Sequence, residues 1–177
     1  MSTFDALFDR FEHSAFRYEG RQSYDVGGAE AERIQAWREH QPRPERSVRT
    51  SPWLRRIAVT TAAGKDWRRV RAVDWPLPEY LRYELGGYVE SQAAGDQILM
   101  IDRSAAPASA PDFWLFDGGT PRSRAAVMDY SEDGAFEGFR LVTHPTELSL
   151  LEEIRVRLLA RATPLNVFLA SLESSVA

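Results

Sequence analysis

The chain has 177 residues, 44% of them hydrophobic, a net charge of −4 and no cysteine. This length and apolar content fit one domain with a sizeable core, while the lack of cysteine excludes disulfides, thiolate metal sites and a cysteine nucleophile. The sequence has no long apolar run, and its first residues lack the basic and apolar regions of a secretion signal, so we expect a cytoplasmic protein without a membrane partner.

A short helix is predicted at the N-terminus, because apolar side chains repeat at the i, i+3, i+4, i+7 spacing of one helical face. These side chains are Phe4, Leu7, Phe8 and Phe11. Thr3 is the expected N-cap of this helix, since an acidic residue follows it in the first turn.

From residue 14 the apolar period changes to two, which is typical of a strand. We expect Phe16 and Tyr18 to be buried in this strand. Arg17 and Glu19 would then lie on its opposite side.

The junction between this helix and the strand carries two weak catalytic candidates, Glu12 and His13. A histidine beside a carboxylate can act as a general base. Adjacent residues do not face each other on a helix, however, and no second histidine lies nearby in the sequence. A structural hydrogen bond made by His13 is therefore the favoured prediction.

Positive charge is concentrated in residues 33–71, which hold eleven basic and three acidic side chains, a local charge of +8. Residues 29–40 predict a helix with Ile34 and Trp37 on its buried side. The segment QPRPERSVRTSP, residues 41–52, has three prolines and no apolar period, which predicts a loop.

A β-hairpin is predicted next. Residues 54–61 place Ile57 and Val59 on one side of an alternating strand, residues 67–75 alternate again, and AAGKD between them has the composition of a turn. Strand parity assigns one face of the second arm to Trp67, Arg69, Arg71, Val73 and Trp75.

Two interpretations of this arginine and aromatic face are open. Surfaces that bind phosphates and stack on bases combine these residue types, but arginine stems also cover apolar surface on an ordinary solvated sheet face. The second interpretation is favoured. The binding candidates from this face and its neighbours are Arg56, Trp67, Arg69, Arg71, Trp75, Tyr80, Arg82 and Glu84.

The second half of the chain alternates between helical and strand patterns. A helix begins at Pro78 and ends at Gly95, and a short apolar strand covers residues 97–102. Beyond the loop of residues 103–111, three strands are expected in an antiparallel group. Their ranges are 112–117, 124–130 and 135–143. Pro145 then begins an amphipathic helix, and a last turn or short helix follows Pro164.

Motifs for common chemistries are absent from the sequence. There is no phosphate-binding glycine loop and no nucleophile elbow, and the three histidines have no ligand spacing. Asp112 and Asp117 fall on opposite faces of their strand, which argues against a paired-carboxylate site. We therefore expect no metal site and no cofactor, and we favour a protein without enzymatic activity.

Six landmarks, in this order and spacing, resemble a large actinobacterial family of uncharacterised proteins: EHSAFRYE, WLRRI, TAAGKDWRRVRAV, PLPEYLRYEL, AGDQI and DFWLFD. The resemblance covers residues 4–170. Members of this family have no established activity and are commonly encoded beside helix-turn-helix regulators of the xenobiotic-response-element type. The C-terminal part also resembles the end of the sensor domain attached to such regulators. The resemblance therefore implies a helix-turn-helix regulator as the protein partner.

These observations predict one α+β domain over residues 1–177, with a subdivision near the loop of residues 103–111. The sheet is expected to be mainly antiparallel and covered by an N-terminal and a C-terminal helix. The favoured function is a non-enzymatic accessory or sensor module whose arginine and aromatic face, with the loop of residues 41–52, contacts the regulator. The alternative is a phosphate-handling enzyme or nucleic-acid-binding protein that uses the arginines of residues 55–71.

Overall fold

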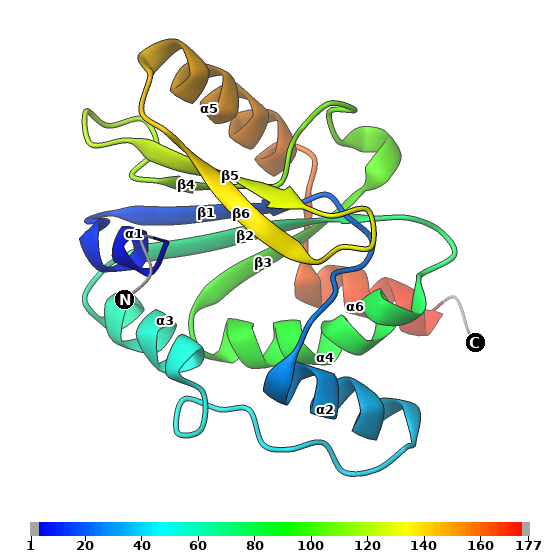
Figure 1. The fold of residues 1–177 in the computed structure, drawn as a ribbon. Helices are drawn as coiled ribbons and strands as arrows, with labels where there is room; N and C mark the ends of the chain where they lie inside the picture. Colours follow the sequence, from blue (N-terminus) through cyan, green and yellow to red (C-terminus); the bar gives the residue numbers. More distant parts are fainter. Residues whose placement is uncertain (1–3, 175–177) are drawn as a thin grey trace.

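A computed structural model describes residues 4–174, and Figure 1 shows one twisted sheet with helices on both of its faces. The helices in this range are α1 (Asp5–Arg10), α2 (Gly28–Arg38), α3 (Pro52–Ala62), α4 (Glu79–Ala93), α5 (Pro145–Leu159) and α6 (Leu165–Ser174), with a short 3-10 helix at Arg103–Ala105. The strands are β1 (Ser14–Glu19), β2 (Asp66–Val73), β3 (Asp96–Asp102), β4 (Phe113–Phe116), β5 (Arg124–Tyr130), β6 (Phe136–Val142) and β7 (Thr163–Pro164).

The sheet has seven strands in the order β6-β5-β4-β1-β2-β3-β7. β1, β2 and β3 run parallel to one another, whereas the other four neighbouring pairs are antiparallel. Parallel neighbours need a crossover connection; α2 and α3 provide it between β1 and β2, and α4 provides it between β2 and β3. The fold is therefore α+β with a mixed, mostly antiparallel sheet, in line with the predicted class.

The hairpin predicted for residues 54–61 and 67–75 is wrong. Its first arm is helical and belongs to α3, and its second arm is β2, which pairs in parallel with both of its neighbours. Val59, which the hairpin would bury, is 63% exposed, whereas Ile57 is fully buried. Two apolar residues in alternation were therefore too short a pattern to define a strand.

Local start signals explain why this segment is helical. The Oγ of Ser51 accepts a hydrogen bond from the amide of Leu54 at 3.3 Å, and Pro52 occupies the first turn of α3. Leu54 and Ile57 lie three residues apart and are both buried, as one face of a helix requires. The cap and the helical spacing together outweigh the short alternation in the same residues.

The other predicted helices and strands lie close to their expected positions. In β1, Phe16 and Tyr18 are buried as expected. Arg17 and Glu19 lie on the opposite side of the strand, but that side is buried too. Thr3, the expected cap of α1, lies outside the described residues.

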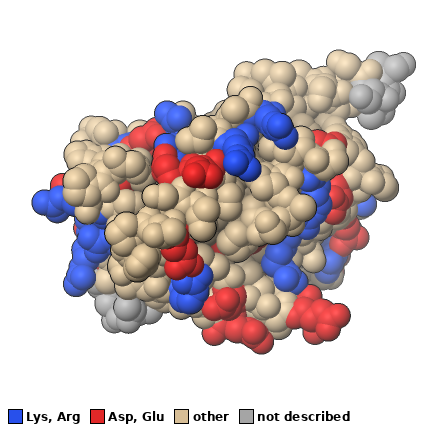
Figure 2. All heavy atoms as spheres, turned by 90° about the horizontal axis from the view of Figure 1, so that it is seen from above, with Lys and Arg blue, Asp and Glu red and all other residues tan. Residues whose placement is uncertain are grey.

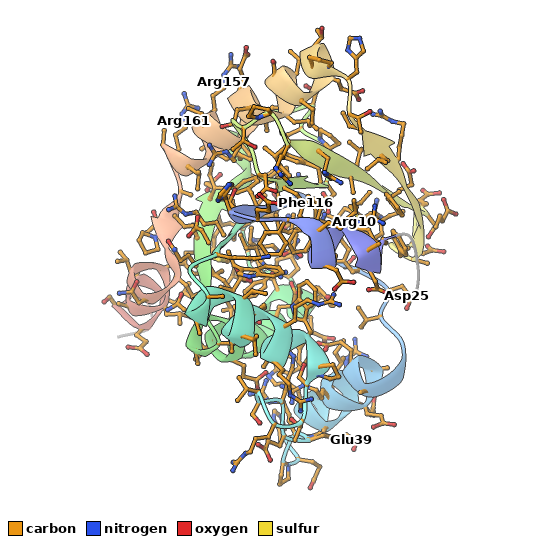
Figure 3. All side chains as sticks on the ribbon, turned by 90° about the vertical axis from the view of Figure 1, so that its left-hand side faces the viewer. Arg10, Asp25, Glu39, Phe116, Arg157 and Arg161 are labelled. Carbon is orange, nitrogen blue, oxygen red and sulfur yellow. The ribbon has the colours of Figure 1, made fainter. Side chains whose placement is uncertain are left out.

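Three hydrophobic clusters form the core. The first joins α1 and α3 to one face of the sheet, where the rings of Phe8, Trp67 and Trp114 pack on one another. The second packs α5 on the opposite face, and the third joins α4 and α6 to the first face. Figure 1 shows this division of the helices between the two faces. In Figure 3, Phe116 lies in the interior and Glu39 at the periphery.

Charged side chains separate the first and third clusters on the central strand. Along one face of β2, Trp67 belongs to the first cluster and Val73 to the third. The two positions between them on that face are Arg69 and Arg71. The centre of this face is therefore polar although it lies inside the protein, and it is the starting point for the candidate site.

Candidate functional site

The structure brings together half of the sequence-predicted binding residues. Those that meet in the interior are Arg69, Arg71, Tyr80 and Glu84. The others are dispersed. Trp67 is buried among aromatic rings, Arg56 pairs with Asp9 of α1 at 3.2 Å, and Arg82 and Trp75 are exposed.

The solvated face predicted on β2 is wrong. Strand parity correctly placed Trp67, Arg69 and Arg71 on one face, but helices cover that face. Trp67 is 1% exposed and Arg71 is 0% exposed. Trp67 and Arg71 are therefore inaccessible to another protein while the chain is folded. The charge of Arg71 is compensated within the chain by Glu84.

Glu12 and His13 are both exposed, and their structural contacts are made by the backbone. The carboxylate of Asp117 accepts hydrogen bonds from the amides of Glu12 at 2.9 Å, His13 at 2.6 Å and Ser14 at 3.1 Å. The Glu12 side chain pairs with Arg122 instead of with His13. The cluster at this junction therefore fixes the start of β1, and no catalytic pair forms.

A buried polar network occupies the centre of the sheet. Its members are Arg17, Glu19, Tyr24, Arg69, Arg71, Glu84, Tyr88, Asp96 and Asp112. The parallel register of β1 and β2 places Arg17 beside Arg69 and Glu19 beside Arg71. Two arginines thus meet at the first of these positions and an acid faces an arginine at the second, and acids from β1, β3, α4 and the start of β4 compensate the three cations.

Carboxylates flank each of two guanidinium groups. Glu19 accepts from Nη1 of Arg69 at 2.7 Å and from Nε of Arg17 at 3.4 Å. On its other side, Arg69 pairs with Asp96 at 3.3 Å, and Arg17 pairs with Asp112 at 3.3 Å. These interactions fix the guanidinium groups, because a buried charge without its partner is costly.

Arg71 is the most deeply placed cation of the network. Its Nη2 lies 3.2 Å from Oε2 of Glu84, and its Nη1 lies 3.3 Å from the hydroxyl of Tyr24. Its guanidinium also sits 5.1 Å from the centre of the Tyr24 ring, and Nη1 donates to the carbonyl of Arg21. The segment after β1 and helix α4 are thereby tied to the middle of β2.

The hydroxyl of Tyr88 lies between two carboxyl groups. It lies 3.0 Å from Oε2 of Glu19 and 2.9 Å from Oε2 of Glu84. A phenol has one proton to donate, so Tyr88 shares it between the two carboxyl groups. Burial raises the pKa of Glu84, whereas at Glu19 three neighbouring guanidinium groups outweigh burial and lower the pKa to about 2. Glu84 therefore takes up a proton more readily than Glu19 does.

A cavity of about 240 Å³ adjoins the network, and we name it the network cavity. Its wall is formed by Val26, Glu30, Arg46, Trp53, Arg69, Tyr80, Glu84, Gly87, Tyr88 and Ser91. Three of these, Arg69, Glu84 and Tyr88, belong to the buried polar network. A larger hollow of about 810 Å³ between the end of α2 and the following loop contains no member of the network. Two other cavities each include one network member, Asp112 or Asp96, whereas the network cavity includes three.

The loop of residues 41–51 reaches the network cavity through Arg46. Its Nη1 donates to the carbonyl of Gly87 at 3.1 Å and lies 3.2 Å from the Glu90 carboxylate. A neighbouring arginine, Arg43, lies so close to Gly86 that a Cβ there would come within 2.7 Å of its Nη1. Glycine in a helix costs about 1 kcal/mol relative to alanine. At Gly86 the absence of a Cβ makes room for the guanidinium group of Arg43.

Gly87, the second glycine of α4, has a different environment. A Cβ at this position would meet no atom within 4 Å. Gly87 also forms part of the wall of the network cavity. A side chain introduced here would therefore enter open space at the cavity instead of the packed core.

Acids from other elements compensate the positive charge of residues 33–71. The ion pairs include Arg33–Glu90, Arg38–Glu79, Arg46–Glu90, Arg56–Asp9, Arg69–Glu19 and Arg71–Glu84. Figure 2 shows that, on the face it presents, basic and acidic side chains lie side by side instead of in a patch of one sign. The ion pairs therefore neutralise much of the local excess of positive charge within the fold.

Sequence reasoning missed Arg17, Glu19 and Tyr88 as site residues. A signal for the first two was present, since FRYE and RRVR both place charges at alternate positions of an apolar strand. Two such strands bury their charges only if they lie side by side. Nothing in the sequence marks the hydroxyl of Tyr88.

Two kinds of feature are absent from residues 4–174. No group of three or more histidine, cysteine, aspartate or glutamate side chains there is arranged to hold a metal ion. No helix in the same range combines the length and apolar character needed to cross a membrane.

Residues 2–170 match the model of a protein family described as a domain of unknown function, DUF6879. The chain belongs to this family. Membership of a family of uncharacterised proteins, which the landmarks predicted, is thereby confirmed. No curated protein matches the sequence. The family carries no activity over to this chain, so function has to be argued from the network and its cavity.

Proposed function

We propose that this chain is a sensor module without enzymatic activity, which binds a small polar molecule in the network cavity and transmits the bound state to a protein partner. The observation that carries the proposal is that fixed charged groups of the buried network face a cavity of about 240 Å³. Ligand sites are concave and present a few well-placed polar groups. Groups already held by ion pairs lose little freedom when a ligand binds.

Binding is favoured over catalysis because the cavity wall offers no activated nucleophile. Its hydroxyl groups belong to Tyr80, Tyr88 and Ser91, and the wall contains no histidine. Burial raises the pKa of both tyrosines, which disfavours a phenolate. Glu84 accepts from the hydroxyl of Tyr88 at 2.9 Å and lies 3.2 Å from Arg71, so its carboxyl group is already engaged within the protein.

The proposed partner is a helix-turn-helix transcriptional regulator, as the resemblance to an actinobacterial family implies. The geometry suggests a route by which the bound state reaches such a partner. Arg46 is in the cavity wall, while Val48 and Arg49 of the same loop are exposed. A ligand that displaces Arg46 from Glu90 and Gly87 would change the outer surface of this loop.

The alternative, a phosphate-handling enzyme or a nucleic-acid-binding protein, remains a prediction without a favouring observation. It was based on a hairpin that does not form. Arg56, Arg69 and Arg71, which it would use, are engaged in ion pairs with acids of the same chain.

Substitutions at Gly87 test the proposal. Gly87→Leu places a bulky side chain at the cavity, whereas Gly87→Ala adds one methyl group and serves as the matched control. A collection of small polar metabolites is screened against the intact chain by thermal shift and native mass spectrometry. We expect at least one compound to bind the natural chain and Gly87→Ala but not Gly87→Leu. Binding that persists in a folded Gly87→Leu variant, or no binding at all, refutes the proposed function.

A further inference from the structure

The network cavity has a donor side formed by two guanidinium groups. Arg69 uses Nη1 for Glu19 and Nε for Asp96, and its Nη2 makes no hydrogen bond within residues 4–174. The contacts of Arg46 with side chains are long, at 3.2 Å to Glu90 and 3.3 Å to Ser91. Both groups therefore have capacity for a further acceptor. A carboxylate suits it, because guanidinium groups bind carboxylates through parallel hydrogen bonds.

The same cavity has an acceptor side. Oε1 of Glu30 accepts from the hydroxyl of Tyr83 at 2.5 Å, but Glu30 forms no ion pair with any part of the chain that the structure describes. Oε1 of Glu84 accepts from Tyr80 at 3.2 Å and from no other group of residues 4–174, although Oε2 of the same carboxyl group lies 3.2 Å from Arg71, so Glu30 is the main acceptor. A carboxylate in a partly closed site without a cation attracts a positive group.

Aromatic rings complete the wall and suit the same positive group. Trp53, Tyr80 and Tyr88 all contribute to it. An ammonium group near the face of such rings is attracted by their negative charge density. The faces of the rings therefore strengthen the acceptor side.

The size of the cavity limits the ligand. A volume of about 240 Å³ corresponds to roughly eight water molecules at the volume each occupies in the liquid. This is enough for a small molecule with two charged groups. The ligand must therefore carry both charges a short distance apart.

We infer that the network cavity binds a small zwitterion with one carboxylate and one ammonium group, the chemistry of a free α-amino acid. This inference rests on the proposed function and specifies its ligand class. The carboxylate meets Arg46 and Arg69, and the ammonium group meets Glu30 and the aromatic rings. Removing either charge from the ligand should weaken binding strongly, since it leaves one side of the cavity without its partner.

The test compares three probe series on the intact chain by calorimetry and thermal shift. The series are the free proteinogenic L-amino acids, their N-acetyl derivatives and their α-amides. We expect at least one free amino acid to bind with a Kd of about 1 mM or tighter, and its two derivatives to bind roughly tenfold or more weakly. A derivative that binds as tightly as the free amino acid overturns the inference.

Charge-removing variants assign the two sides. Arg46→Gln should abolish the preference for the acid over the α-amide, and Glu30→Gln, which keeps an acceptor for Tyr83, should abolish the preference for the free amine over the N-acetyl form. Arg49→Gln on the same loop and Glu32→Gln on the same helix are exposed matched controls and should leave both preferences unchanged. Preferences that survive in both test variants overturn the inference.

The outcomes separate this inference from the proposed function. If no free amino acid binds, but another metabolite binds in a manner that Gly87→Leu abolishes, the zwitterion is wrong and the sensor site stands. If nothing binds in a Gly87-dependent manner, both fail. Binding of a free amino acid that depends on Gly87, Arg46 and Glu30 supports both.

Discussion

Replacing Arg71 with methionine tests whether the buried polar network stabilises the fold. The side chain of Arg71 is fully buried and lies 3.2 Å from the carboxyl group of Glu84. Removing one partner of a buried ion pair costs roughly 3–5 kcal/mol, because the other charge stays behind without compensation. We expect the lower end, about 3 kcal/mol, since Glu84 can remain as a neutral carboxyl group.

Urea unfolding gives the free energy of unfolding for this comparison, and thermal unfolding gives an independent value. A loss of about 3 kcal/mol corresponds to a fall in Tm of roughly 6–12 °C for a domain of this size. Arg68→Met is the matched control, because Arg68 lies on the same strand, is 40% exposed and pairs with Asp66 at 2.9 Å. Exposed pairs contribute about 0–1 kcal/mol, so its loss should stay in that range.

Equal losses in the free energy of unfolding for Arg71→Met and Arg68→Met would refute the reasoning. They would show that burial does not change the contribution of these two ion pairs to stability. Arg71→Lys provides a second comparison if the methionine variant does not fold. It keeps the charge but lacks the planar fork of guanidinium donors. We expect an intermediate loss, and a loss no larger than that of Arg68→Met contradicts the network in the same way.

Glu84→Gln should flatten the pH dependence of stability above pH 4.5. The pKa of Glu84 is raised in the folded state. Its contribution to stability is therefore complete below the ordinary pKa of 4.5 and is lost as the pH rises through the folded pKa. Urea unfolding at several pH values measures this, and a free energy of unfolding that depends on pH as in the natural chain contradicts it. Gly86→Ala should displace Arg43, because the new Cβ would lie 2.7 Å from its Nη1. Faster trypsin cleavage in the adjoining loop is the expected result, and unaltered cleavage shows that this contact does not hold the loop. Asp117→Ala should destabilise the protein by at least about 3 kcal/mol, because the carboxylate accepts from three amides and each hydrogen bond to a charged acceptor contributes roughly 1.5–3 kcal/mol. His13→Ala keeps its backbone amide and should change stability by no more than about 0.5 kcal/mol; similar thermal shifts for these last two variants contradict the role given to the carboxylate.

Periodicity in the sequence located most of the elements and, within β1 and β2, which side chains share a face. The alternation from residue 14 correctly buried Phe16 and Tyr18 in β1. Parity also placed Trp67, Arg69 and Arg71 on one face of β2. These features could be predicted because they depend on the local geometry of the chain, in which a side chain's direction follows from its position along a strand or helix.

Parallel pairing and the burial of the arginines were decided only by the tertiary structure. The hairpin was predicted because Ile57 and Val59 alternate, whereas the structure makes that segment a helix and pairs β2 with β1 and β3. Alternation along a strand predicts which side chains share a face, but it does not predict which strand pairs with it. Pairing depends on crossover connections whose contacts lie far apart in the sequence.

The candidate site depends on the tertiary structure for the same reason. Arg69 reaches Asp96 across 27 residues, and Arg17 reaches Asp112 across 95 residues. In the sequence these arginines are indistinguishable from solvated ones, because the free energy of burying a charge depends on whether a partner of opposite sign is brought to it. The sequence by itself determined that charges alternate with apolar residues on two strands. Only the folded chain decided that these strands are neighbours, and the low dielectric of that shared interior is what turns ordinary charges into a fixed network beside a cavity.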